Sequence, residues 1–251
     1  MNILLTNDDG FKSKGIKILY KYLKKLTKNI LIVAPDRERS AVSQSITLNS
    51  PIRMFKIKNN FYAIDGTPTD CVYLTILGAT NFKPDIVISG INKGPNMGED
   101  IVYSGTVAAA IEATFANLIA FSVSIDAVHT DKIYYETAAE FCCILLKKII
   151  KFKLPKGVFL NVNVPNLPKS KIKGVKITKL GTRKYLDKLI KRTDPKGNPY
   201  FWLAGDEVLW SNKKNTDYYE VKNGFISVTP LHLDLTAYKI IPLIKKWNLK
   251  F

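Results

Sequence analysis

Short apolar runs alternate with longer amphipathic stretches along the first two thirds of the chain. Four runs are almost wholly apolar and of strand length, at Asn2–Thr6, Ile30–Ala34, Asp85–Ser89 and Leu118–Val123. Apolar residues recur at helical spacing in three intervening stretches, at Gly15–Lys28, Gly105–Asn117 and Tyr134–Phe152. Continuous apolar strands that alternate with helices are typical of a parallel sheet covered on both faces. The pattern therefore predicts an α/β fold.

Beyond Pro165 the pattern changes. Strand-like pieces at Lys176–Lys179 and Tyr200–Trp210 lie among Gly, Pro, Asn and charged residues, which predicts a β-arm that extends from the core. Gly224–Thr229 then predicts a return to a core strand, and Leu235–Trp247 an amphipathic terminal helix. No repeat or linker divides the chain. We predict one domain over residues 1–251, with a core at about 1–165 and 222–233, a β-arm at about 171–221 and a C-terminal helix at about 234–248.

The composition is that of an ordinary globular protein, with 46% hydrophobic and 24% charged residues. No run approaches the ~18 apolar residues of a membrane span, and the N-terminus reaches acidic residues too early for a secretory signal. The three cysteines, two of them adjacent in a helical pattern, fit reduced thiols better than a disulfide framework. We therefore expect a cytoplasmic protein that does not bind a membrane.

The formal net charge of +17 is typical of proteins that bind nucleic acids or other polyanions. The lysines are dispersed, however, over one polar helix face and at alternating positions of predicted strands, as on a solvated surface. Nucleic-acid binding is therefore the less favoured interpretation. The charge would attract an anionic substrate in either case.

Three polar segments follow directly after predicted strands, at Thr6–Gly10, Ala34–Ser40 and Ser89–Asn96. The carboxyl ends of parallel strands lie at one edge of a sheet, and ligands bind there where the strand order reverses. We expect the three segments to meet at that edge.

Asp8 and Asp9 lie side by side in the first segment, and Gly10 allows a tight turn. Two adjacent carboxylates repel each other, and a divalent cation that binds both removes this cost. An Asp-Gly sequence also makes ordinary turns, so this alternative stays open. Ser40 and Asn92 could supply neutral oxygen ligands to Mg²⁺ or Mn²⁺, or could simply serve as cap and turn residues.

Tyr103–Thr106 predicts the start of a helix, with Ser104 as its N-cap. Free N–H groups at a helix start bind anions, and Gly105 would let a phosphate approach the backbone closely. A well-capped core helix is the competing interpretation. The sequence holds neither a Walker lysine motif nor a Rossmann glycine fingerprint, which argues against nucleotide hydrolysis of the Walker type and against dinucleotide binding.

Six motifs occur in order along the chain, each weak alone and specific as a series. They are Asn7-Asp8-Asp9-Gly10, Ala34-Pro35-Asp36-Arg37 with Ser40, Gly66-Thr67-Pro68-Thr69-Asp70, Ser89-Gly90-Ile91-Asn92 with Gly94 and Asn96, Tyr103-Ser104-Gly105-Thr106, and Thr229-Pro230-Leu231. The series resembles the SurE family of survival-protein nucleotidases. The likeness runs from residue 1 to about 240 without a large gap.

This resemblance implies a Rossmann-like, three-layer α/β/α core with a mostly parallel sheet, and a β-arm and C-terminal helix that are used in oligomerisation. It implies a phosphatase that hydrolyses nucleoside 5′-monophosphates, 3′-monophosphates and, in some members, short polyphosphate. One divalent metal ion per subunit, Mg²⁺ or Mn²⁺, would be the cofactor. Homodimers or homotetramers that exchange C-terminal elements are usual in the family.

The resemblance also assigns roles to individual residues. Those that match the family's metal ligands are Asp8, Asp9, Ser40 and Asn92, and those that match its phosphate pocket are Asn96, Ser104, Gly105 and Thr106. One departure follows the first motif, where Lys12-Ser13-Lys14-Gly15 replaces a stretch that often ends in Ala-Pro-Gly. This change could alter the rim of the site and leaves the ligands intact.

Asp8 or Asp9 could act as the catalytic base toward a water, and direct attack by a carboxylate is equally open. The competing function is a nucleotide- or RNA-binding protein that uses the same site without hydrolysis. It would account for the basic charge, but not for two carboxylates at an anion site. A sugar-nucleotide enzyme with an acidic pair is a third interpretation, with no further signature in its favour.

Overall fold

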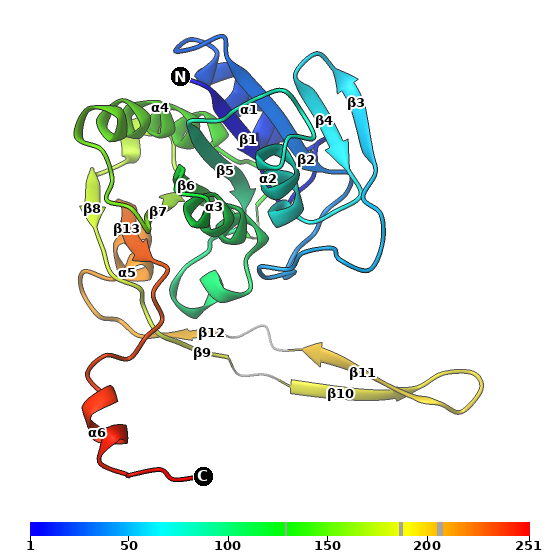
Figure 1. The fold of residues 1–251 in the computed structure, drawn as a ribbon, viewed down its shortest axis with the longest axis vertical. Coiled ribbons are helices and arrows are strands. Elements are labelled where there is room, and N and C mark those ends of the chain that lie inside the picture. Colours follow the sequence, from blue (N-terminus) through cyan, green and yellow to red (C-terminus); the bar gives the residue numbers. More distant parts are fainter. Residues whose placement is uncertain (129, 186–187, 205–207) are drawn as a thin grey trace.

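A nine-stranded sheet forms the centre of the molecule, which we describe from a computed structural model over residues 1–128, 130–185, 188–204 and 208–251. Its strands are β1 (Ile3–Thr6), β2 (Ile30–Pro35), β3 (Met54–Lys58), β4 (Phe61–Ile64), β5 (Ile86–Lys93), β6 (Ile119–Asp126), β7 (Val158–Pro165), β8 (Val175–Ile177) and β13 (Ile226–His232). Their order in space is β3-β4-β2-β1-β5-β6-β7-β13-β8 (Figure 1).

Strand β1 lies at the point where the strand order reverses. It pairs in parallel with β2 on one side and with β5 on the other, and β4, β6 and β7 continue the parallel arrangement outward. Strand β3 is antiparallel to β4, and β13 is antiparallel to β7. The loops after β1 and β5 therefore diverge at the edge where open α/β sheets bind ligands.

Helices cover both faces of the sheet, which confirms the three-layer α/β/α prediction. Helices α1 (Lys14–Leu23) and α4 (Tyr135–Phe152) pack on one face, and α2 (Pro68–Ile76) and α3 (Gly105–Phe115) on the other (Figure 1). Alternate side chains of β1 divide between the two cores: Ile3 and Leu5 join the α1–α4 side, whereas Leu4 joins the α2–α3 side. Among the described residues, no helix combines the length and apolarity needed to cross a bilayer.

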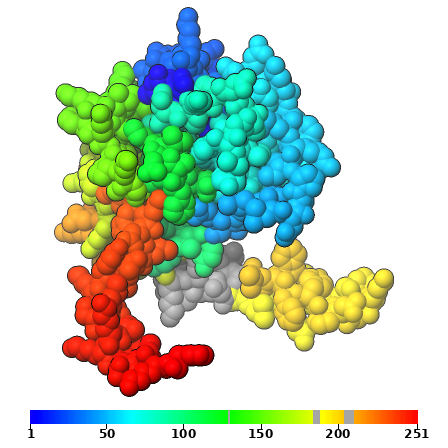
Figure 2. All heavy atoms as spheres, in the orientation of Figure 1, coloured from blue at the N-terminus to red at the C-terminus, as the bar shows by residue number. Residues whose placement is uncertain are grey.

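A β-arm and the C-terminal tail project from this body (Figures 1 and 2). The arm contains β9 (Arg183–Tyr185), β10 (Lys188–Thr193), β11 (Pro199–Ala204) and β12 (Val208–Trp210), in two antiparallel pairs. Part of the predicted strand Tyr200–Trp210, at residues 205–207, lies outside the described residues. Trp202 and Leu203 are 62% and 88% exposed, so this ribbon has no core of its own in one chain.

The predicted arm at 171–221 is too long. Strand β8 pairs with β13 in the main sheet, and a helix that the sequence pattern did not predict, α5 (Asp217–Lys222), packs beneath β13 and β7. Strand β7 was also missed, because the buried Asn161 and Asn163 interrupt its apolar run. Helix α1 ends at Leu23, five residues before the predicted Lys28.

The predicted C-terminal helix at 234–248 is wrong in extent, because α6 spans only Ile241–Lys245. Pro242 stands in the first turn of α6, where proline is tolerated, and it would have broken a helix that began at Leu235. Asp234 also accepts hydrogen bonds from the Thr236 N–H and the Tyr238 hydroxyl, which holds the preceding segment in a turn. The tail has little surface to pack against, and short helices are marginal without packing.

Candidate metal and phosphate site

A cleft of about 320 Å³ opens where the loops after β1, β2 and β5 meet. Six of the eight predicted site residues line it, namely Asp8, Asp9, Ser40, Asn92, Asn96 and Ser104. The other two, Gly105 and Thr106, lie directly behind Asp8. The structure thus brings together residues from three loops, as the position of the motifs after the strands predicts.

Asp8 is held in one orientation by the first turn of α3. The Thr106 N–H donates to its Oδ2 at 3.0 Å and the Thr106 hydroxyl to its Oδ1 at 2.5 Å, so both carboxylate oxygens are engaged. A side chain at Gly105 would place its Cβ 3.0 Å from the Cβ of Asp8, a tight contact that would push against the Asp8 side chain. The backbone oxygen of Asp8 accepts from the Arg39 N–H at 2.8 Å, which joins the β1 and β2 loops.

Asp9 is held from the opposite side of the cleft. Its Oδ2 accepts a hydrogen bond from the Lys93 backbone N–H at 3.1 Å, at the end of β5. Burial, and next to it repulsion from Asp8, raises the pKa of Asp9 to about 7. Burial also raises the pKa of Asp8, against the opposite effect of its two bonds to Thr106. Glu38, which the sequence analysis passed over, adds repulsion to both.

The donor atoms around the two carboxylates fit a hard divalent cation. Asp8 is buried and Asp9 is half-buried, both have raised pKa values, and a cation would remove the repulsion between them. Asn92 donates its amide N–H to the Gly94 carbonyl at 2.9 Å, which leaves the side-chain oxygen as a possible ligand. The Ser40 hydroxyl donates to Glu38 at 2.6 Å and retains its lone pairs. An all-oxygen set of this kind suits Mg²⁺ or Mn²⁺.

Asn96 is fixed by a layer of buried polar side chains beneath the cleft. Its backbone N–H donates to Asn163 at 2.9 Å, and its carbonyl accepts from the amides of Asn161 and Asn163. Its own side-chain amide donates to Ser124 at 2.8 Å. These supporting residues lie on β6 and β7, and sequence reasoning missed them. The alternation of Asn with Val in β7 was the available signal.

The start of α3 leaves one N–H group for a ligand. Ser104 is the N-cap, as predicted, and its hydroxyl accepts the Val107 N–H at 3.1 Å. Thr106 gives both its donors to Asp8, so in this structure it orients a carboxylate and does not point a donor into the cleft. Among the described residues, the Gly105 N–H has no acceptor, although Gly105 itself does not line the cleft. It is the first-turn donor that a phosphate could take.

The Gly66–Asp70 motif serves the architecture around the cleft. Thr67 and Asp70 form a capping box at the start of α2. Asp70 also accepts from the N–H and hydroxyl of Thr47, and the Thr67 hydroxyl donates to the Ser45 carbonyl. These bonds attach the loop that carries Ser40 to the start of α2.

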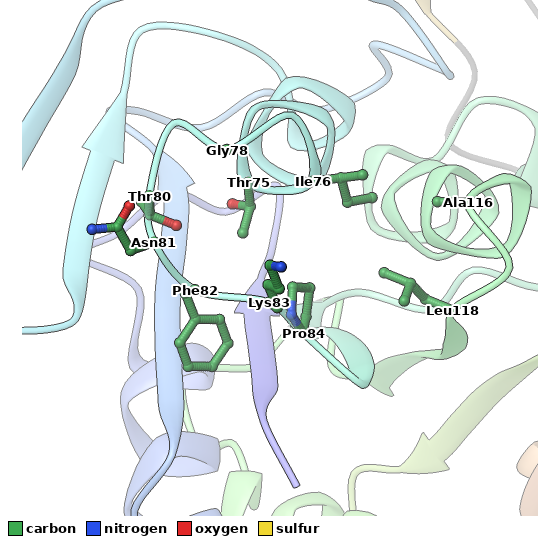
Figure 3. A pocket seen from close by; sticks show the side chains of 10 residues that line it. All are labelled: Thr75, Ile76, Gly78, Thr80, Asn81, Phe82, Lys83, Pro84, Ala116 and Leu118. Atoms are coloured by element: carbon green, nitrogen blue, oxygen red, sulfur yellow. The ribbon is translucent and has the colours of Figure 1, made fainter.

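A second hollow lies at the opposite edge of the sheet, between the C-terminal ends of α2 and α3 (Figure 3). Its volume is about 560 Å³, and its described lining is mainly apolar, with Ile76, Phe82 and Leu118 among the ten residues. None of these ten is a carboxylate, so the larger hollow lacks ligands for a hard cation. The smaller cleft at Asp8 and Asp9 is therefore the candidate site.

Comparison with known proteins agrees with this architecture. The chain matches the family model described as survival protein SurE over residues 3–187. A protein named 5′-nucleotidase SurE from Aquifex aeolicus is 46% identical over 246 residues, which cover 96% of each chain. Another with that name, from Pelobacter propionicus, is 43% identical over 247 residues, which cover 98% of this chain and 99% of its own.

A solved structure extends the agreement to three dimensions. The crystal structure of the SurE protein from Aquifex aeolicus superposes with a TM-score of 0.88 at 44% identity, covering 99% of this chain and 100% of that one. The likeness therefore spans almost the whole of both chains. The chain belongs to the SurE family.

Proposed function

We propose that this chain is a divalent-metal-dependent phosphatase that hydrolyses nucleoside 5′-monophosphates to nucleoside and phosphate. The observation that carries the proposal is the contact between Asp8 and the start of α3, which sets the acidic pair Asp8 and Asp9 beside a helix start. Thr106 satisfies Asp8, but the repulsion of Asp9 and of a phosphate by Asp8 remains, and a divalent cation bound at the pair would remove it. The names of the relatives support the nucleotide substrate.

Each residue of the cleft has a role in this proposal. Asp8, Asp9, Ser40 and Asn92 would hold Mg²⁺ or Mn²⁺, one ion per subunit, and the bound ion would neutralise phosphate charge and orient a water. The Gly105 N–H, with the Asn96 and Ser104 side chains, would bind the phosphate oxygens. Thr106 keeps Asp8 in place by its two hydrogen bonds. Asp8 or Asp9 would accept the proton of the attacking water.

The finer properties are proposed on the family resemblance. They are hydrolysis of 3′-monophosphates, hydrolysis of short polyphosphate, and a location in the cytoplasm. The three free cysteines fit a reducing compartment, since Cys71 and Cys142 are buried in the core. A comparison of phosphate release from 5′-AMP, 3′-AMP and a short polyphosphate chain, at equal enzyme and Mn²⁺ concentrations, separates these activities.

The central test is phosphate release from AMP. We expect turnover with Mn²⁺ or Mg²⁺ and none in excess EDTA, because the acidic pair alone would repel the substrate. Asp8→Asn and Asp9→Asn should each lower kcat/KM by about a hundredfold or more while the protein stays folded by circular dichroism. Turnover that persists in EDTA, or full activity in either variant, would refute metal dependence at this pair. Binding of AMP without any release of phosphate would favour the non-hydrolytic alternative.

A matched pair of variants tests the contact between Thr106 and Asp8. Thr106→Val has nearly the same shape and loses the hydroxyl donor, whereas Thr106→Ser keeps it. We expect the valine variant to weaken Mn²⁺ binding about tenfold, as the loss of a partner that orients a metal ligand typically does. The serine variant should bind Mn²⁺ like the wild type in calorimetry. Equal affinities in the two variants would show that Thr106 contributes only packing.

The raised pKa of Asp9 predicts a pH dependence of stability in the metal-free protein. The folded pKa of about 7 lies above the unfolded value of 3.8, so the protonated form stabilises the fold. This contribution is complete below pH 4 and is lost as the pH rises through about 7. In chelator, the unfolding free energy of the wild type relative to Asp9→Asn should therefore fall over this window, by at most ~4 kcal/mol at ~1.4 kcal/mol per pKa unit.

Denaturant unfolding of both proteins at several pH values measures this difference. With saturating Mn²⁺ the trend should disappear or reverse, because the ion binds the ionised carboxylate. Parallel pH curves for the two proteins in chelator would contradict the raised pKa.

We also propose that the protein is a homodimer or homotetramer. The arm and the tail carry large apolar side chains, including Leu203, Leu235 and Trp247, that are exposed to solvent in a single chain and that a second chain could cover. Light scattering at micromolar concentration should therefore give at least twice the chain mass of 28.3 kDa. A mass of one chain under these conditions would contradict the proposal.

A further inference from the structure

Residues 181–183, which lead into β9 and which we call the foot of the arm, contact the segment that forms one wall of the cleft. This cleft segment, residues 96–104, contains a short 3₁₀ helix, η1 (Gly98–Val102), and contributes Asn96, Tyr103 and Ser104 to the cleft lining. Figure 1 shows β9 and β12 beneath the loop that joins β5 to α3. The arm and the cleft therefore share a boundary at η1.

Asp217, at the first position of α5, joins the two sides of this boundary. Its side chain is fully buried, at 0% exposure. Its Oδ2 accepts the Gly98 N–H at 2.8 Å, and its Oδ1 accepts the N–H groups of Gly181 at 2.7 Å and of Tyr218 at 2.8 Å. One carboxylate thus binds the cleft segment, the foot of the arm and α5 together.

Close packing surrounds this carboxylate. Gly98 has a φ of +54°, and a Cβ there would lie 2.9 Å from the Gly181 carbonyl oxygen, so the two backbones touch. The Trp210 ring stacks on Tyr218 with 4.3 Å between ring centroids. Arg183 donates its backbone N–H to Glu99 and forms an ion pair with Asp100. The cleft segment is therefore fixed from outside the sheet at several consecutive residues.

We propose that Asp217 is a positioning residue for phosphate binding, which holds Gly98 and thereby adds to the placement of Ser104 and of Asn96, which β7 also holds. This inference rests on the proposed function, because it assumes that these two side chains contact the phosphate. It gives α5 and the arm foot a role in the reaction, although no atom of Asp217 lines the cleft. If the hydrogen bond between Gly98 and Asp217 only stabilised the fold, its loss would leave the affinity for substrate unchanged.

Asp217→Asn tests this role with little change in shape. An amide oxygen at the Oδ1 position can still accept hydrogen bonds from the Gly181 and Tyr218 N–H groups. The amide nitrogen at the Oδ2 position faces the Gly98 N–H and cannot accept a hydrogen bond from it. We expect the KM for AMP and the inhibition constant of inorganic phosphate to rise about tenfold or more, with a smaller change in kcat, because the affected contacts bind phosphate in ground and transition states alike. Amide exchange at residues 98–104 should accelerate.

A milder variant, Gly181→Ala, tests the same role if Asp217→Asn does not fold. Gly181→Ala would place its Cβ 3.0 Å from the Asp217 Oδ1, which displaces the carboxylate slightly from outside the cleft. Its KM should rise in the same direction by a smaller factor. An unchanged KM in both Asp217→Asn and Gly181→Ala, at confirmed faster exchange, would overturn the proposal.

Glu220→Ala is the matched control on the same helix. Glu220 is also buried, at 6% exposure, and its carboxylate accepts the Asn215 N–H at 3.1 Å without reaching the cleft segment. We expect this variant to lower the melting temperature and to keep the wild-type KM. If it raises KM as much as Asp217→Asn at an equal loss of stability, the effect of Asp217 is general destabilisation and the proposal fails.

Failure of the proposed function is distinguishable from failure of this inference. If the wild type hydrolyses no nucleotide, the function is wrong, and calorimetric binding of inorganic phosphate in the presence of Mn²⁺ then decides the role of Asp217. Weaker phosphate binding in Asp217→Asn than in Glu220→Ala supports positioning. Equal phosphate affinity in the two variants overturns it.

Discussion

The two hydrogen bonds from Thr106 to Asp8 join the end of the first strand to the start of α3, and the rest of the site depends on this contact. It requires β1 to end at the reversal of strand order and α3 to begin at the same edge of the sheet. Glycine at position 105 favours it, because a Cβ there would meet Asp8 and Pro68 at a tight 3.0 Å. The helix start and the acidic pair are consequently one structural unit, in which a substitution at either side moves the other.

This unit stores electrostatic repulsion. Asp8 and Asp9 are both in places where burial raises their pKa, and Glu38 adds to the effect. Without a cation, the folded structure therefore disfavours the ionised form of both carboxyl groups. A divalent cation bound to them would favour that form instead. Metal binding at such a site would be coupled to stability, and the basic exterior of the protein would then have a clear use. A net charge of +17 attracts an anionic substrate toward a cleft whose own side chains are acidic.

The sequence predicted the parts of the structure that local patterns encode. Ser104 signals a helix start through capping chemistry, and Asp8 follows a continuous apolar strand, so both the edge of the sheet and the residues gathered there could be predicted. The sequence predictions failed where tertiary contacts outweigh the local pattern of apolar and polar residues. Asn161 and Asn163 look like loop residues, yet on β7 they are buried because Asn96 satisfies them. Pro242 limits α6 although the apolar period around it continues.

The role of Thr106 shows why site residues are harder to predict than folds. Its position in the motif assigns it to phosphate, but its two donors both bind Asp8 in this structure. Sequence order cannot distinguish a group that touches substrate from one that orients a neighbour, because both must lie at the same helix start. The same reasoning applies at Asp217, which is distant in sequence from every motif of the cleft. A buried carboxylate that accepts three backbone N–H groups from three segments fixes their relative placement, so the C-terminal third of the chain helps to hold a cleft whose lining residues all lie in the first half.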